Sequence, residues 1–118
     1  MKKPKPAAKT DLPPAARNFA TRHAQIWAAY ETLGAAAAKA GPLDARTRRL
    51  VKLALAIGAQ AQGAASSHAR RAREEGASTA DMYHVAALAV TTLGLPAAVR
   101  AMAWIDGAIE QKPAKRKT

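Results

Sequence analysis

The sequence contains no cysteine among its 118 residues. This chain therefore carries no disulfide bond, no thiolate metal ligand and no cysteine nucleophile. Aromatic residues are also scarce, at 4% of the chain, so alanine supplies most of the hydrophobic fraction of 49%. Because each alanine buries little apolar area, the core must form from many small contacts between closely packed helices.

Long hydrophobic runs are absent as well. No stretch of about 18 residues is free of charges and turn formers, so the sequence predicts no transmembrane helix and no membrane partner. Residues 1–6 are rich in lysine and proline, and no apolar segment follows them to act as a signal sequence. We therefore expect a cytoplasmic protein, and the lack of cysteine agrees with a reducing compartment.

The formal net charge of +11 is concentrated at the two ends of the chain. Residues 1–10 and residues 111–118 each carry four basic and no acidic side chains, which leaves +3 for residues 11–110. Both ends mix lysine, proline and alanine, with too little apolar surface to offset the entropy lost on ordering. We predict disordered basic arms at residues 1–11 and 111–118, which bind nucleic acid, if at all, without sequence specificity.

The segment between the arms has the pattern of an all-α domain of five to six helices over residues 12–110. Apolar residues recur at intervals of three and four, and no alternating strand pattern is present. One amphipathic helix is predicted from near Pro13 to Ala37, and one central apolar helix from Met82 to Leu93. The predicted caps and stops of the helices are Asp44, the Ser78 and Asp81 pair, and Gly76.

Four stretches of the sequence together resemble a known family. They are residues 43–59, LDARTRRLVKLALAIGA; residues 67–72, SHARRA; residues 75–78, EGAS; and residues 85–98, VAALAVTTLGLPAA. Their order of helix cap, glycine break, histidine and second capped helix resembles the carboxymuconolactone decarboxylase and alkylhydroperoxidase-like family. The resemblance implies an oligomeric helical bundle, a homotrimer or homohexamer. A domain of about 100 residues also has more apolar helix surface than it can bury alone, which favours self-association.

The resemblance also bears on chemistry, because redox members of that family carry a Cys-x-x-Cys pair just ahead of a histidine. The two matching positions here are Ala61 and Ala64, and the position of the family's proton-relay glutamate is Arg49. Only His68 of that constellation remains, so thiol peroxidase activity is excluded. The decarboxylase branch does not depend on the cysteine pair, which implies acid/base chemistry on a small carboxylated lactone.

Two residues are the candidates for this chemistry. A neutral imidazole at His68 can move a proton near pH 7, although a buried histidine satisfied by one hydrogen bond is the alternative. Arg49 can pair with an anionic substrate, although the arginines around it also suit a solvated surface. His23 and His84 are interpreted as core or rim histidines, so no metal and no cofactor are expected.

The sequence thus predicts a non-redox protein of this family that binds or acts on a small carboxylated or lactone-type molecule. Its catalytic residue is His68 and its substrate-binding residue is Arg49; if it is an enzyme, it is a lyase rather than a peroxidase. The alternative is a helical oligomer whose lysine-rich arms bind nucleic acid or another polyanion. Binding that weakens steeply with salt would favour this alternative.

Overall fold

The computed structural model describes residues 12–110, and these residues form helices and no strand. Six helices have nine residues or more and a seventh, α6, has four. The all-α fold predicted from the sequence is therefore confirmed. The chain divides into two compact units after Pro42. The predicted arms lie outside the described residues, and a single domain over residues 12–110 stays a prediction.

The first unit contains α1 (Pro14–Arg22) and α2 (Ala24–Ala38), where the sequence predicted one continuous helix. The break lies at His23, whose φ of −128° and ψ of 59° are not helical. Its backbone N–H still bonds to Phe19 O at 2.8 Å and its carbonyl accepts from Trp27 N at 2.9 Å. The Phe19 ring lies near the rings of both His23 and Trp27, with centroid distances of 4.9 and 6.4 Å. The bend therefore costs few backbone hydrogen bonds and is accompanied by aromatic contacts.

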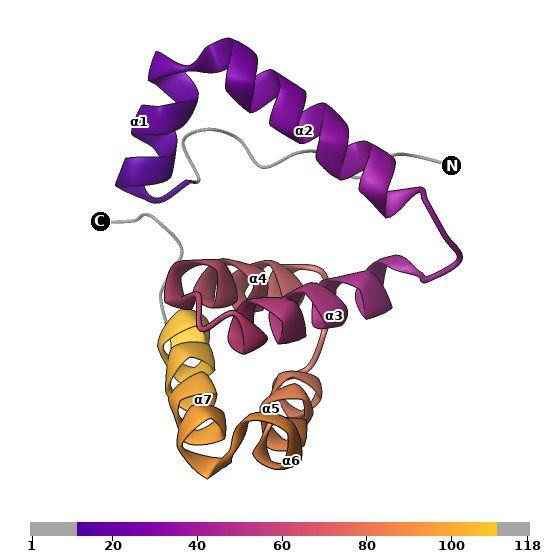
Figure 1. The fold of residues 1–118 in the computed structure, drawn as a ribbon, viewed down its shortest axis with the longest axis vertical. Coiled ribbons are helices and arrows are strands. Elements are labelled where there is room, and N and C mark those ends of the chain that lie inside the picture. The colour runs from indigo at the N-terminus through magenta and orange to yellow at the C-terminus, as the bar shows by residue number, and fades with distance from the viewer. Residues whose placement is uncertain (1–11, 111–118) are drawn as a thin grey trace. The chain divides into compact units, whose positions relative to one another are not determined.

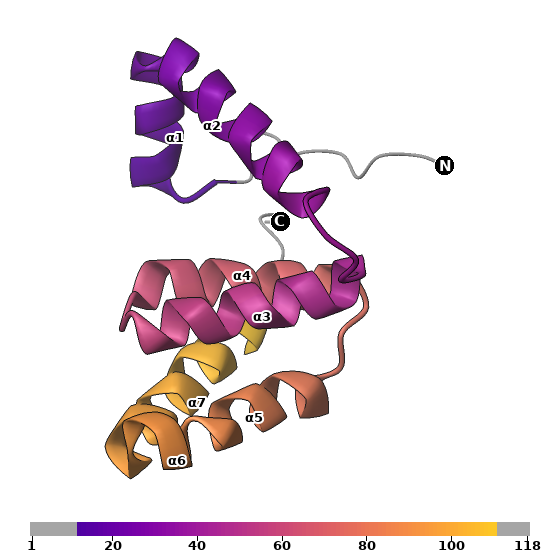
Figure 2. The same ribbon diagram turned by 45° about the vertical axis from the view of Figure 1, so that its right-hand side comes forward.

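The second unit contains α3 (Ala45–Gly58), α4 (Gln62–Glu74), α5 (Thr79–Leu88), α6 (Val90–Leu93) and α7 (Leu95–Glu110). Helix α3 packs against α4 and α5, and α7 packs against α4 and α5 from the other side. Figures 1 and 2 show α3 and α4 side by side, with α5 and α7 forming a second layer against them. The four long helices thus enclose one core.

Local sequence signals explain where these helices begin and end. The Asp44 side chain accepts from Thr47 N at 2.8 Å and caps α3. Ser78 and Asp81 form the predicted capping box of α5, each side chain accepting from the other residue's backbone N–H. Helix α4 ends before Gly76, whose φ of 96° is readily adopted only by glycine.

The core of the second unit is built mostly from alanine. Leu53, Met82 and Ile105 are its largest fully buried side chains. The buried alanines that surround them are Ala56, Ala65, Ala69, Ala72, Ala77, Ala86, Ala89, Ala98, Ala101 and Ala108. Small side chains let the helix backbones approach closely, so each large residue at the centre contributes a large share of the buried apolar volume.

The prediction of one central helix from Met82 to Leu93 was wrong. Helix α5 ends at Leu88, Ala89 caps it, and the short α6 follows. The Ala89 carbonyl accepts from the backbone N–H of both Leu93 and Gly94, which closes a turn around that residue. The small Ala86 and Ala89 face the core while Leu88 and Leu93 are exposed. Apolar composition alone did not reveal which side of the segment is buried.

Large apolar side chains remain exposed on both units, among them Tyr30 and Leu33 of α2 and Leu95 and Val99 of α7. Such surfaces are typical of contacts with another molecule. Self-association as a trimer or hexamer stays a prediction. Among the described residues, no helix is both long and apolar enough to cross a membrane.

Candidate functional site

The turn between α3 and α4 brings Arg49 and His68 together. Helix α3 ends at Gly58, and Gln60 takes a left-handed φ of 55° before α4 begins. The Gln60 side chain donates to Ile57 O at 2.8 Å, and its own oxygen accepts two bonds from Arg100 of α7. The turn is therefore held from both sides, and α4 runs back along α3 with His68 half-buried in their contact.

Arg49 joins His68 and Glu75 in a cluster of three polar or charged side chains. Its Nη1 lies 2.9 Å from His68 Nδ1. Its Nε and Nη2 donate to the two carboxylate oxygens of Glu75, each at 3.0 Å. Glu75 caps the C-terminus of α4, so the cluster draws one residue from α3, one from within α4 and one from the end of α4. This two-bond pairing is the strongest geometry for guanidinium and carboxylate.

The Arg49 contact determines which nitrogen of His68 carries the proton. A guanidinium only donates, so Nδ1 must be the acceptor and the neutral ring carries its proton on Nε2. Burial and, after it, the positive charges of Arg49, Lys52 and Arg71 lower the pKa of His68 from 6.5 to about 4, against the opposing effect of Glu75. At neutral pH the imidazole is therefore uncharged.

The surroundings of His68 are electropositive. Burial and the charges of Arg49, Arg71 and Arg48 lower the pKa of Lys52, while Glu75 opposes them. Several cations thus lie around one uncharged histidine, and the carboxylate of Glu75 only partly balances them. Such a cluster favours binding of a further anion.

The neighbouring arginines have partners of their own. Arg46 pairs with Asp81 of α5 at 2.6 Å, and Arg48 donates to Leu43 O at 2.5 Å. Neither is joined to His68, so Arg49 is the one arginine of this helix start that the structure bonds to the histidine. The other two histidines lie elsewhere: His23 is at the bend between α1 and α2, and His84 is exposed on α5.

Glu75 belongs to the cluster and is not among the site residues predicted from the sequence. It pairs with Arg49, 26 residues earlier in the chain. Its position seven residues after His68 places it two turns farther along the same side of α4. The spacing of Glu75 from His68 was the signal available in the sequence. It was not used, because an acidic residue at a helix end also suits pairing with basic neighbours on the same helix.

The family's two cysteine positions lie next to this cluster. Ala61 is the N-cap residue of α4, and Ala64 lies in its first turn, one turn before His68. With no thiol at either position, the ionisable groups of this cluster are His68, Arg49 and Glu75. The cluster can bind an anion and move a proton, and it holds no group that transfers electrons.

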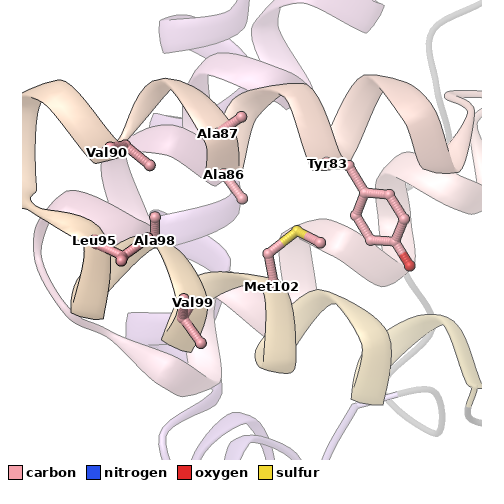
Figure 3. A pocket seen from close by; sticks show the side chains of 8 residues that line it. All are labelled: Tyr83, Ala86, Ala87, Val90, Leu95, Ala98, Val99 and Met102. Atoms are coloured by element: carbon pink, nitrogen blue, oxygen red, sulfur yellow. The ribbon is translucent and has the colours of Figure 1, made fainter.

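A separate apolar cavity of about 340 Å³ lies between α5, α6 and α7. Figure 3 shows the side chains that line it: Tyr83, Ala86, Ala87, Val90, Leu95, Ala98, Val99 and Met102. The Tyr83 hydroxyl donates to Asp106 at 2.5 Å, which raises the pKa of Tyr83. No lining residue comes from α3 or α4, and none is a cation. The cavity therefore does not include His68 and offers nothing to pair with a carboxylate.

One family model matches most of the described chain. The model of the carboxymuconolactone decarboxylase family matches residues 24–107. An uncharacterized protein of Haemophilus influenzae is 48% identical over 44 residues, which are 37% of this chain and 39% of that protein's length. The fold is similar to the crystal structure of a carboxymuconolactone decarboxylase family protein from Legionella pneumophila, with a TM-score of 0.65 and 24% identity. That match covers 77% of this chain and 84% of the other.

Proposed function

Since the chain belongs to the carboxymuconolactone decarboxylase family, we propose that it is a non-redox member acting on a small carboxylated lactone. Arg49 binds the carboxylate of the molecule, and His68 is the acid/base group. The family's name gives carboxymuconolactone as the first compound to test. The absence of cysteine excludes thiol peroxidase chemistry in this chain.

One observation carries this proposal: Arg49 already holds a carboxylate through two parallel hydrogen bonds while it contacts His68. The geometry needed for a substrate carboxylate is thus realised with an internal one. A guanidinium recognises a planar carboxylate through two bonds at once, whereas a lysine offers only a point charge. The observation favours an anionic ligand at α3 and α4 over an uncharged one.

The tautomer of His68 suggests how the proton moves. The free lone pair of the neutral ring is at Nδ1, where Arg49 now donates. When Arg49 Nη1 turns toward a bound carboxylate, Nδ1 becomes free to accept a proton. The guanidinium of Arg49 then turns away from the ring, which raises the pKa of His68 from its low value and makes the ring a better base. Binding and basicity are therefore coupled.

Replacing Arg49 by methionine is expected to weaken binding of benzoate, a simple carboxylate, by about 10–100-fold, because hydrogen bonds to charged groups contribute roughly 1.5–3 kcal/mol. The measurement is an NMR titration that follows the His68 ring signals. Arg70→Met is the matched control. It also removes one positive charge, in this case from α4, but it breaks no hydrogen bond to His68. Equal benzoate affinity in the Arg49→Met and wild-type proteins would contradict the proposal.

The charge distribution supports a second candidate function. Residues 1–10 and 111–118 carry +8 of the net charge of +11. A polyanion such as nucleic acid would contact these lysines through phosphates, and its affinity would fall steeply as salt increases. The carboxylate site does not depend on the arms, so deleting residues 1–10 and 112–118 separates the two functions.

A further inference from the structure

The side chain of Glu75 occupies the same donors that a ligand carboxylate needs. Arg49 Nε and Nη2 are both bonded to it, and Nη1 is bonded to His68. Three of the five N–H groups of the guanidinium are thus taken, and the single Nε–H is among them, so a second pair through Nε and Nη2 cannot form. A ligand carboxylate that pairs with Arg49 in this geometry must first displace Glu75.

We propose that Glu75 is an internal competitor that leaves Arg49 when a small carboxylate binds. This inference rests on the proposed function and adds a residue that sets the affinity of the site. The ligand class is an anion with two coplanar acceptor oxygens, of which a monocarboxylate is the simplest. Glu75 acts by holding the guanidinium in place and by excluding ligands too weak to displace it.

The exposure of the two partners shows which one can leave. The side chain of Arg49 is 16% exposed, whereas that of Glu75 is 46% exposed. Arg49 is held within the contact between α3 and α4 by its bond to His68. Glu75 follows the last helical residue of α4 and has solvent beside it, so a rotation of its side chain returns the carboxylate to water. Because the Glu75 side of this ion pair is so exposed, the pair contributes little net stability. Displacement of Glu75 therefore costs little free energy.

The charges around His68 favour replacement of Glu75 by a ligand carboxylate over binding of the ligand beside Glu75 or loss of Glu75 alone. Removal of Glu75 alone would leave Arg49, Lys52 and Arg71 around His68 without a nearby carboxylate. Replacement of Glu75 by a ligand carboxylate keeps one negative charge on Arg49 throughout. The free-energy cost of leaving the mostly buried Arg49 without a charged partner is thereby avoided. The cluster is thus paired in the free protein and paired again when a ligand is bound.

The test compares Glu75→Gln with Glu74→Gln by NMR titration with benzoate at low salt. Both variants remove one negative charge from the end of α4, but only the first removes the carboxylate that pairs with Arg49. Benzoate should bind about two- to fivefold more tightly to Glu75→Gln than to Glu74→Gln, the range expected for loss of a partly exposed competing ion pair. Equal affinities of the two variants, or weaker binding to Glu75→Gln, would overturn the inference.

The outcomes also separate this inference from the proposed function. If benzoate binds the wild-type protein and Arg49→Met abolishes binding, the site is real; equal affinities of the two glutamine variants then overturn the role of Glu75 alone. If benzoate fails to bind any of these proteins, both proposals are overturned. The Arg49 Nε–H signal gives a second readout, because it should shift in Glu75→Gln without ligand and should not shift in Glu74→Gln. Glu75→Ala is expected to behave as Glu75→Gln does.

Discussion

Replacing His68 by asparagine is expected to lower the turnover of carboxymuconolactone by about 10²–10⁴-fold, the usual contribution of a positioned proton-transfer group. The asparagine amide oxygen can take the place of Nδ1 as acceptor for Arg49, so the ion pair with Glu75 is retained. What is lost is the group that takes up a proton. The rate is measured spectroscopically at neutral pH, with His84→Asn as the control because His84 is exposed on α5.

The pH dependence of stability gives this variant a second readout. The pKa of His68 is lowered from 6.5 to about 4 in the folded chain, so the unfolded chain binds its proton first as pH falls. The folded protein therefore has its full stability above pH 6.5 and loses part of it as pH falls toward 4. His68→Asn should lose less stability over that interval than the wild type. Unchanged turnover in His68→Asn would contradict the catalytic role, and a large loss of stability at neutral pH would indicate a structural histidine.

Replacing Leu53 by alanine is expected to destabilise the protein by about 2–5 kcal/mol, the range seen when a large core side chain is truncated. Leu53 is 0% exposed and lies among small alanines, so little can move in to fill the space it leaves. The change in the free energy of unfolding is measured by urea denaturation followed by circular dichroism.

Leu55→Ala is the matched control, because Leu55 lies on the same helix and is 67% exposed. It should change the free energy of unfolding by less than about 1 kcal/mol. Equal losses from the two substitutions, at any protein concentration, would show that the core does not depend on Leu53 as described.

Much of the fold could be predicted because its signals are local. Asp44, the Ser78 and Asp81 pair, and Gly76 begin or end helices through contacts within a few residues, and the structure contains each of them. The two helix breaks at His23 and Ala89 were missed. Neither position is a proline or a glycine, so no helix-breaking residue marks the break. Both breaks depend on how side chains pack in the folded protein, which the spacing of apolar residues does not predict.

The candidate site was predictable only in part. His68 was found from its place in the family pattern, and Arg49 from the substitution of a relay position. Their contact at 2.9 Å depends on how α4 returns along α3, which the intervening turn at Gln60 determines. Glu75 was missed because its partner lies on another helix, and sequence spacing indicates only partners on the same one.

The most direct test of the site is the pKa of His68, measured by NMR titration of its ring signals with and without benzoate. The free protein should titrate at about 4. Saturating benzoate should raise this pKa, because Arg49 then turns from the ring toward the ligand, and Arg49→Met should raise it without benzoate, because the nearest cation is gone. A pKa near the ordinary value of 6.5 that neither benzoate nor Arg49→Met changes would contradict the account, since His68 would then be neither buried beside Arg49 nor coupled to a bound carboxylate.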